Sequence, residues 1–276
     1  MSARYAVIGN PIGHTKSPAI HTAFAQATGQ DLTYTAIEGK RGGFAAEIDA
    51  FRAAGGMGVN ITTPFKLDAF AYADRLKPVA QLAGAVNCLN FADGKAEGEN
   101  FDGLGLTRDI VANLGVALRG KRILLLGAGG AARGALLPFL HEQPEELVIV
   151  NRTLAKAIAI SEQFASHGTI IATGYEALSG ERAGQYDVVV NATSASLHQE
   201  LPPVPASVFR SGALAYELLY GKGLTPFLRL AREAGVTHLA DGVGMLVEQA
   251  AEAFAWWRGI RPETAGMINK MTVKLT

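Results

Sequence analysis

A short apolar run, RILLL (residues 122–126), leads directly into the glycine-rich stretch GAGGAARG, which begins at Gly127. The run suits a central strand of a parallel sheet, and the small and apolar residues after it can open a helix. Gly127, Gly129 and Ala132 match the G-x-G-x-x-A pattern, in which glycines allow a tight turn and let backbone N–H groups approach a pyrophosphate. The stretch predicts a dinucleotide-binding turn, with a plain strand-to-helix turn as the alternative.

The residues at the end of the next strand-like run indicate whether the cofactor is NAD or NADP. NAD sites usually place an acidic residue there to accept hydrogen bonds from the ribose 2′-hydroxyl. Here that position, 24 residues after Gly127, is Asn151. Arg152, Thr153 and Lys156 follow it, and Arg binds a phosphate bidentately while Lys adds a point charge. We therefore expect NADP; the alternative is a pair of solvated cations at the start of a surface helix.

Strand-like runs alternate with helix-like segments through most of the chain, a pattern typical of parallel sheets covered by helices. These runs lie at Tyr5–Asn10, Leu32–Ile37, Gly58–Thr62, Arg122–Leu126, Leu147–Asn151, Thr169–Ala172, Asp187–Asn191 and Ala213–Glu217. Between the two groups, VNCLNFADGKAEGEN predicts a hairpin that turns at Asp93-Gly94. The sequence thus predicts an α/β fold with two α/β domains, joined by structured residues 103–117.

Composition favours a small-molecule partner. The chain has 276 residues, and Lys plus Arg equal Asp plus Glu at 25 each, so no net field attracts nucleic acid or an anionic membrane surface. Cys88 is the only cysteine, which excludes an intrachain disulfide framework and argues against a cysteine-based metal cage. The N-terminal stretch lacks the apolar core of a signal peptide, and no apolar run approaches the roughly twenty residues of a membrane span. We expect a cytoplasmic protein.

Four polar clusters stand in apolar surroundings in the first hundred or so residues: GNPIGHTKSP, GVNITTPFK, GAVNCL and GENFDGLG. Loops at the carboxyl ends of parallel strands are where open α/β sheets bind ligands. Each cluster also has a structural explanation, because Ser17 and Asp102 could cap helices and Lys66 could be an ordinary exposed lysine. The four clusters together indicate a pocket for a small hydroxylated acid.

These motifs, together with NRT, NATS and DGVGMLVEQAAEAF, resemble the shikimate dehydrogenase family over nearly the whole chain and in the family's order. The resemblance implies reversible, NADP(H)-dependent interconversion of 3-dehydroshikimate and shikimate. It also implies an N-terminal substrate-binding and catalytic domain (1–104) and a Rossmann-type NADP-binding domain (105–240). Residues 241–276 would return to the first domain, so that the C-terminal helices pack back on it and substrate and cofactor share one cleft.

The resemblance implies a role for each matching position. Lys66 and Asp102 would form a catalytic dyad that shares the proton transfer, which requires no metal. The substrate-binding positions would be Thr15, Ser17, Thr62, Asn87, Tyr220 and Gln249. The cofactor-binding positions would be Gly127, Ala128, Gly129, Gly130, Ala131, Asn151, Arg152, Thr153, Lys156, Leu218 and Gly242.

Four positions depart from the usual family pattern. Phe101 and Cys88 stand where threonine is usual, Thr15 replaces serine, and Glu217 replaces aspartate. Phe101 matters most, because it brings a bulky apolar ring beside Asp102. Two alternatives therefore stay open: a paralogue that prefers quinate or another hydroxylated cyclic acid, and a sensor that binds NADP(H) without turnover. The sequence is equally compatible with a monomer and a homodimer.

Overall fold

The computed structural model describes residues 2–180 and 185–275, and the contacts within the chain divide it into two units. The first unit comprises Met1–Gly105 and Val247–Met267, and the second comprises Leu106–Leu246 and Ile268–Thr276. Residues 1 and 276, the outer ends of the predicted domains, lie outside the described part of the chain. Within the described ranges, no helix combines the length and the apolar character that crossing a bilayer requires.

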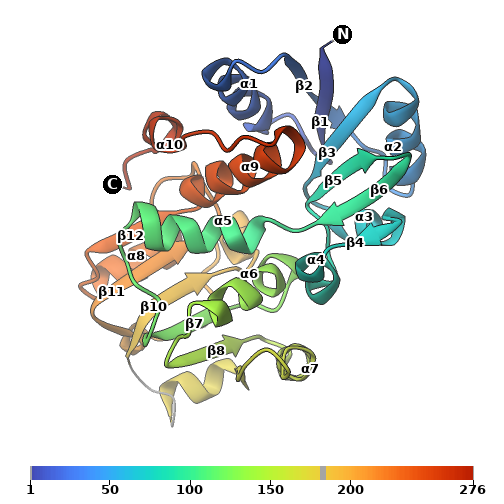
Figure 1. Ribbon diagram of the computed structural model, residues 1–276. Helices are drawn as coiled ribbons and strands as arrows, with labels where there is room; N and C mark the ends of the chain where they lie inside the picture. The colour runs from blue at the N-terminus through green and yellow to red at the C-terminus, as the bar shows by residue number, and fades with distance from the viewer. Residues whose placement is uncertain (1, 181–184, 276) are drawn as a thin grey trace. The chain divides into compact units, whose positions relative to one another are not determined.

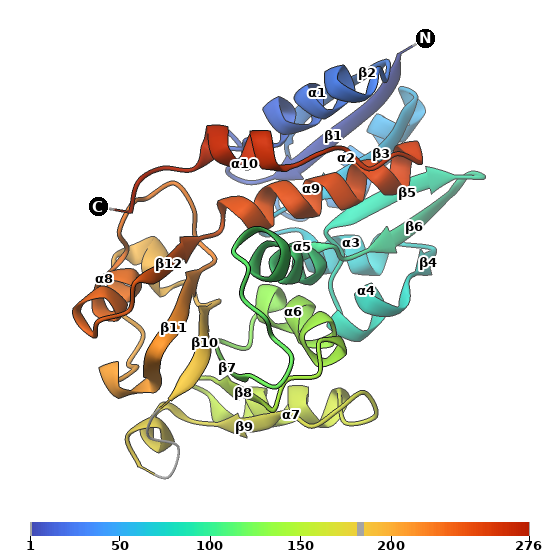
Figure 2. The ribbon, with the colours of Figure 1, turned by 60° about the vertical axis from the view of Figure 1, so that its left-hand side comes forward.

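The first unit contains a mixed six-stranded sheet in the order β2-β1-β3-β5-β6-β4 (Figure 1). Its strands are β1 (Ala3–Gly9), β2 (Leu32–Glu38), β3 (Gly56–Ile61), β4 (Arg75–Leu76), β5 (Cys88–Ala92) and β6 (Lys95–Glu99). Strands β2, β1 and β3 run parallel, whereas β5 runs antiparallel to both β3 and β6. The predicted hairpin is confirmed as β5–β6, and its turn residues Asp93 and Gly94 have φ values of 51° and 71°. Figure 2 shows this hairpin at the edge of the unit.

Helices cover this sheet where apolar residues recur at helical spacing. They are α1 (Ser17–Thr28), α2 (Phe44–Ala53), α3 (Lys66–Tyr72) and α4 (Pro78–Ala83). One core cluster packs Ile48 and Phe65 against sheet residues such as Ile8 and Val59, all at most 1% exposed. This packing fixes the loops that follow β1 and β3.

The second unit contains a parallel six-stranded sheet in the order β12-β11-β10-β7-β8-β9. Its strands are β7 (Arg122–Leu126), β8 (Glu146–Val150), β9 (Ile171–Thr173), β10 (Tyr186–Asn191), β11 (Phe209–Glu217) and β12 (His238–Asp241). The apolar run of β7 lies at the centre of the sheet, and its last four residues are fully buried. The predicted α/β class is therefore confirmed, although β4 and β12 were not predicted because such short strands carry no periodic signal.

The helices of the second unit are α6 (Gly130–His141), α7 (Leu154–Gln163) and α8 (Pro226–Glu233). Short 3₁₀ turns lie at Tyr175–Ser179, Ala195–His198 and Ala206–Val208. Helix α8 begins as its sequence dictates, with Pro226 at the first turn and the Thr225 hydroxyl accepting the Leu228 N–H at 3.3 Å.

Three further helices include the points where the chain passes from one unit to the other. They are α5 (Asp102–Arg108), which continues as a π-helical turn at Asp109–Asn113, α9 (Val243–Arg258) and α10 (Ala265–Met271). The units differ from the predicted domains at Gly105, which belongs to the first unit, and at residues 241–246 and 268–276, which belong to the second. Leu275, for example, packs against the core cluster of the second unit. The functional assignment of the domains stays a prediction.

Candidate active site

Two loops of the first unit carry three of the predicted substrate-binding hydroxyls. Thr15 and Ser17 follow β1, and Thr62 follows β3, its neighbour in the sheet. Each loop contains a cis-proline, and the Asn10 N–H donates to the Thr63 carbonyl oxygen at 3.0 Å. Because the carboxyl ends of parallel strands meet at one edge of a sheet, both loops open at the same edge.

Ser17 lies at the start of α1 but does not cap it. Helix α1 begins at Ser17, and its N-cap residue Lys16 makes no side-chain cap hydrogen bond. Ser17 is buried, at 7% exposure. Its hydroxyl lies 3.3 Å from the Thr15 hydroxyl, and the Thr15 hydroxyl also accepts the Ser17 N–H. The capping alternative for Ser17 is wrong, and the two hydroxyls form a pair.

Lys66 and Asp102 meet although 36 residues separate them. Lys66 is the first residue of α3 and Asp102 the first of α5, so both side chains extend from helix starts that follow strands. Lys66 Nζ lies 2.5 Å from Asp102 Oδ2, with side-chain exposures of 25% and 9%. Lys66 is thus not an ordinary exposed lysine. A partly exposed ammonium held by a nearly buried carboxylate can exchange a proton with a ligand while its position stays fixed.

Asn87 and Gln249 extend this pair into a polar cluster. Asn87 Nδ2 donates to the second oxygen of Asp102 at 2.8 Å and lies 3.4 Å from Gln249 Oε1. The other amide atom, Asn87 Oδ1, accepts the Phe101 N–H at 2.9 Å. Asn87 and Gln249 are buried, at 2% and 9% exposure. Four of the predicted site residues therefore lie in one hydrogen-bonded group.

Asn100 supports the start of α5, the capping role that was the alternative interpretation of Asp102. The Asn100 side-chain oxygen accepts the Asp102 N–H at 3.1 Å, and its amide nitrogen donates to the Ala85 carbonyl at 3.0 Å. Both oxygens of the Asp102 side chain are occupied by Lys66 and Asn87, so Asp102 is not a simple helix cap. An asparagine two residues before a helix start is the signal that would have identified this support.

Phe101 places an aromatic edge beside this polar cluster. Its ring is partly exposed and packs edge-on against Trp256 of α9, with ring centroids 5.7 Å apart and an interplanar angle of 71°. Trp256 lies seven residues after Gln249, so the two side chains share a face of the helix. At this site the first unit therefore combines hydroxyls, amides, the Lys66–Asp102 ion pair and the aromatic ring of Phe101.

A buried layer supports the loop that carries Thr62. The Tyr34 hydroxyl donates to Asn60 Oδ1 at 2.7 Å, and the His21 ring stacks on Tyr34 with centroids 4.2 Å apart and planes 5° from parallel. Burial lowers the pKa of His21 from 6.5 to about 3, and the interaction with Asn60 acts in the opposite direction. His21 is therefore neutral near pH 7 and serves as an aromatic packing group.

In the second unit, the glycine turn leaves the start of α6 open. Gly127 has a φ of +105°, and a Cβ there would lie 3.1 Å from the Ala192 carbonyl oxygen, so a side chain at this position would be strained. Gly129 and Gly130 are exposed, and a Cβ on either would meet nothing within 4 Å. Among the described residues, no side chain caps α6. Its first N–H groups are thus accessible to an anion, which fits the pyrophosphate of a dinucleotide.

The residues after β8 fit a 2′-phosphate. The Asn151 amide donates to the Thr153 carbonyl at 2.9 Å, while Arg152, Thr153 and Lys156 are exposed. Burial raises the pKa of Tyr175, and the nearby charge of Arg152 acts to lower it. Two exposed cations and a hydroxyl surround a turn without a carboxylate, which suits a phosphate dianion.

Two loops of the second unit carry the remaining predicted residues, and one buried carboxylate anchors the first of them. Glu217 accepts from Ser196 Oγ at 2.5 Å, Asn191 Nδ2 at 2.9 Å and Thr225 Oγ1 at 3.1 Å. Burial raises the pKa of Glu217, and these hydrogen bonds lower it. Glu217 departs from the family pattern, but its sequence context did not predict this network. The network ties the ends of β10 and β11 together.

Leu218 and Tyr220 follow this anchor, and Gly242 follows β12. A Cβ on Gly242 would overlap the Leu218 carbonyl oxygen, so only glycine allows this approach. Tyr220 is half-buried, and burial raises the pKa of its hydroxyl, which therefore stays protonated and able to donate. Tyr220 belongs to the second unit, whereas the other predicted substrate-binding residues belong to the first.

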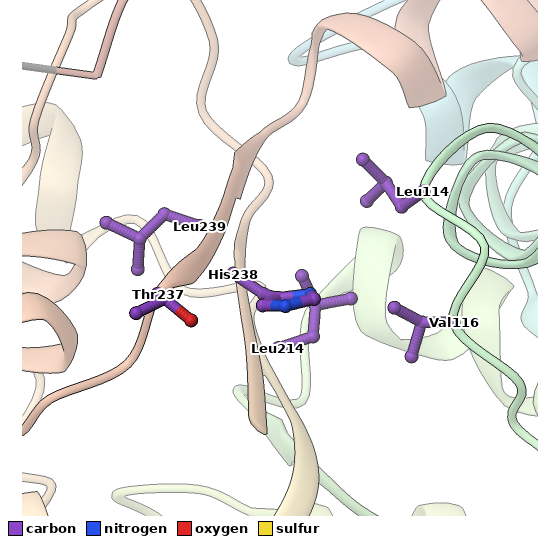
Figure 3. Close-up of a pocket in the computed structure, with 6 residues that line it drawn as sticks. All are labelled: Leu114, Val116, Leu214, Thr237, His238 and Leu239. Atoms are coloured by element: carbon purple, nitrogen blue, oxygen red, sulfur yellow. The ribbon is translucent and has the colours of Figure 1, made fainter. Parts of the chain in front are cut away.

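A cavity of about 280 Å³ lies on the second unit (Figure 3). It is lined by Leu114, Val116, Leu214, Thr237, His238 and Leu239, a set that shares no member with the predicted site residues. In the part of the chain that the structure describes, no group of three or more His, Cys, Asp or Glu side chains could hold a metal ion.

Three family models match the chain. Residues 7–89 match the shikimate dehydrogenase substrate binding domain, residues 109–199 match shikimate / quinate 5-dehydrogenase, and residues 242–271 match the shikimate 5′-dehydrogenase C-terminal domain. Among curated relatives, shikimate dehydrogenase (NADP(+)) of Nitrosospira multiformis is 51% identical over 275 residues, which covers 100% of this chain and 99% of the relative.

Solved structures agree with these matches. The crystal structure of an Ael1 enzyme from Pseudomonas putida is 62% identical, with a TM-score of 0.95 and full coverage of both chains. Shikimate 5-dehydrogenase from Thermus thermophilus, solved in complex with NADP(H) and shikimate, is 33% identical, with a TM-score of 0.86 and 97% coverage of each chain. The chain therefore belongs to the shikimate dehydrogenase family.

Proposed function

We propose that this chain catalyses the reversible NADP(H)-dependent interconversion of 3-dehydroshikimate and shikimate. The observation that supports this most is the contact of Lys66 Nζ with Asp102 Oδ2 at 2.5 Å, within a cluster completed by Asn87 and Gln249. An ion pair of this kind supplies the one proton donor and acceptor that a ketone–alcohol interconversion needs.

In the proposed mechanism, Lys66 Nζ gives a proton to the substrate oxygen as the ketone becomes an alcohol, and it takes that proton back in the reverse direction. Asp102 holds the amine and stabilises its charged form, so the pair acts as one unit in the proton transfer. Asn87 keeps Asp102 in place through the other carboxylate oxygen. When bound, NADP(H) supplies or accepts the hydride.

The substrate carboxylate would be held by hydroxyl groups. Thr15 and Ser17 lie 3.3 Å apart at the edge of the sheet, and Thr62 follows the neighbouring strand. We assign the protonated Tyr220 hydroxyl to the same task and Gln249 to the ring hydroxyls. Several neutral donors can replace the water around a carboxylate without a second buried charge.

The cofactor would lie on the second unit. The start of α6, with backbone from Gly127 to Ala131, would hold the pyrophosphate, and Asn151, Arg152, Thr153 and Lys156 would hold the adenosine 2′-phosphate. Leu218 and Gly242 would approach the nicotinamide, since their backbones already touch. These assignments rest on the fit of the donors to the charges of NADP.

A second candidate is oxidation of quinate or another hydroxylated cyclic acid. The family model that matches residues 109–199 covers shikimate and quinate dehydrogenases alike. In addition, the Phe101 ring, which packs on Trp256, belongs to the residue next to Asp102 and offers no hydrogen bond to a hydroxyl.

A cytoplasmic location, supported by the single buried Cys88, stays part of the proposal.

The deciding experiment is nicotinamide absorbance after mixing the purified protein with shikimate or quinate, each with NADP⁺ and with NAD⁺. We expect rapid reduction of NADP⁺ with shikimate and much slower reactions in the other three combinations. Faster turnover of quinate would transfer the proposal to the second candidate. Binding of NADP(H) without turnover of any cyclic acid would contradict catalysis and leave a sensor.

A further inference from the structure

Tyr216, near the end of β11, makes two hydrogen bonds that the proposed chemistry does not use. Its hydroxyl donates to Asp109 Oδ2 at 2.7 Å and accepts the Met245 N–H at 3.3 Å. Tyr216 is fully buried and Asp109 is 3% exposed. Asp109 begins the π-helical turn, a rare form that often marks a functional position, and its other oxygen accepts Asn113 Nδ2 at 2.9 Å. All these residues belong to the second unit.

The Tyr216 hydroxyl holds the start of α9. The first N–H groups of a helix have no partner within it, and here Asp241 Oδ1 accepts the Val243 N–H while Tyr216 accepts that of Met245. Between them, Gly244 lies so close to the Asp109 carboxylate that a Cβ would overlap it. The backbone of residues 242–245 is therefore held by hydrogen bonds to Asp241 and Tyr216 and lies against the Asp109 carboxylate.

The direction of these hydrogen bonds is fixed as well. Burial raises the pKa of Tyr216 well above its ordinary value, and the neighbouring Asp109 carboxylate raises it further. The phenol therefore keeps its proton and donates a hydrogen bond to Asp109, which leaves an oxygen lone pair to accept the Met245 N–H. Asp109 orients the hydroxyl, and the hydroxyl orients the helix start.

We propose that Tyr216 and Asp109 are positioning residues for the nicotinamide end of the cofactor. They hold the start of α9 so that Gly242 stays against the Leu218 carbonyl, where these two backbones form a fixed platform. This inference rests on the proposed function, because Leu218 and Gly242 are the residues assigned to the nicotinamide. Hydride transfer is sensitive to small errors in distance, and a misplacement of about 1 Å can cost on the order of 100-fold in rate.

The sharpest variant is Tyr216→Phe, which removes one oxygen and keeps the ring in the core. We expect kcat with shikimate and NADP⁺ to fall about 10-fold or more, with KM for shikimate within about 2-fold of wild type. Asp109→Ala should behave in the same way. Asp109→Asn keeps an acceptor for the Tyr216 hydroxyl, so it should restore kcat to within about 3-fold of wild type.

The matched control is Asn113→Ala, which removes a hydrogen bond to Asp109 Oδ1, whereas Tyr216 donates to Asp109 Oδ2. Its kcat should stay within about 2-fold of wild type even where its melting temperature falls. NADPH fluorescence and thermal melting, measured on all variants, separate lost affinity and lost stability from lost positioning.

Wild-type kcat in Tyr216→Phe would overturn the inference, as would equal losses of kcat in Tyr216→Phe and Asn113→Ala. Failure of Asp109→Asn to restore kcat above the Asp109→Ala level would also contradict it. If the wild-type protein itself neither bound NADPH nor oxidised shikimate, the proposed function would fail first, and the inference with it.

Discussion

The two units hold their predicted functional groups in opposite ways. In the first unit, Lys66, Asp102, Asn87 and Gln249 are already bound to one another at 2.5 to 3.4 Å, and three of the four are buried. In the second unit, Gly129, Gly130, Arg152, Thr153 and Lys156 lie exposed in the turns and helix starts that follow β7 and β8. Groups that move a proton need fixed geometry before the substrate arrives. Groups that recognise a highly charged cofactor can rely on accessible N–H groups and cations.

The second unit contains the same contrast on a smaller scale. Helix α6 starts without a side-chain cap within the described chain, whereas the start of α9 is held by Asp241 and Tyr216. An uncapped start can accept an external anion, while a capped start has its N–H groups occupied and acts as a fixed support. A glycine pattern alone does not separate these two cases, because both helix starts are rich in glycine.

The largest expected effect is at the proton-transfer pair. Lys66→Ala should lower kcat by about 10² to 10⁴, the usual contribution of general acid–base catalysis, with a smaller effect on KM. Steady-state kinetics with shikimate and NADP⁺ measure this. Lys77→Ala is the control, since Lys77 also pairs with a carboxylate, Glu97, but at 3.4 Å and 42% side-chain exposure. Near-normal kcat in Lys66→Ala would remove the dyad from the mechanism.

Asp102→Asn tests whether the prearranged cluster contributes to chemistry or only to binding. The variant keeps the size of the side chain and removes the charge that holds Lys66, so we expect kcat to fall by roughly 10², the lower end of that range. Kinetics and a melting curve distinguish this from unfolding. A change confined to KM would make Asp102 a binding group and weaken the contrast between the units.

Arg152→Ala tests the exposed side of the comparison. Loss of one charge-assisted hydrogen bond to phosphate, worth about 1.5–3 kcal/mol, should weaken NADP⁺ binding by roughly 10- to 100-fold and leave NAD⁺ binding unchanged. Titration of both cofactors measures the ratio. Arg210→Ala, an exposed cation 3.2 Å from Asp187 in the same unit, should leave the ratio as it is. Equal loss of NADP⁺ and NAD⁺ affinity would show that Arg152 does not contact the 2′-phosphate.

The smallest effect at neutral pH is expected at His21, which is buried beneath the first unit's loops. Its pKa is about 3 in the folded chain and 6.5 in the unfolded chain, so the unfolded state binds the proton as pH falls below 6.5. Stability attributable to His21 is complete above that pH and falls through the window toward pH 3, by about 2 kcal/mol at pH 5.

His21→Phe keeps the stack on Tyr34 and removes the titration. Denaturant unfolding at pH 7 and pH 5 should therefore show a smaller loss of stability in the variant than in the wild type. An identical loss in both proteins would mean that His21 takes up its proton in the folded state.

Local sequence signals predicted much of the fold. Asp93-Gly94 fixed a hairpin, because both residues adopt positive φ with little strain. The run before Gly127 became a central strand, because a fully apolar run suits burial on both faces. The short strands β4 and β12 were missed, since two and four residues are too few for a periodic pattern.

The roles of the substrate-site residues could be assigned from the sequence only by resemblance, because their contacts join distant segments. Asn87 meets Gln249 across 162 residues, and Tyr216 meets Asp109 across 107. Nothing in the local sequence of LAYE shows that the tyrosine hydroxyl will hold the start of another helix.

The sequence by itself determined which elements form and which residue types stand at their ends, because these follow from local periodicity, turn chemistry and charge. The tertiary structure alone decided that the Asp102 carboxylate meets Lys66 and Asn87, which stand 36 and 15 residues away in the chain. A hydrogen bond between side chains depends on distances of a few tenths of an ångström, and only the packing of strands and helices against one another sets those distances.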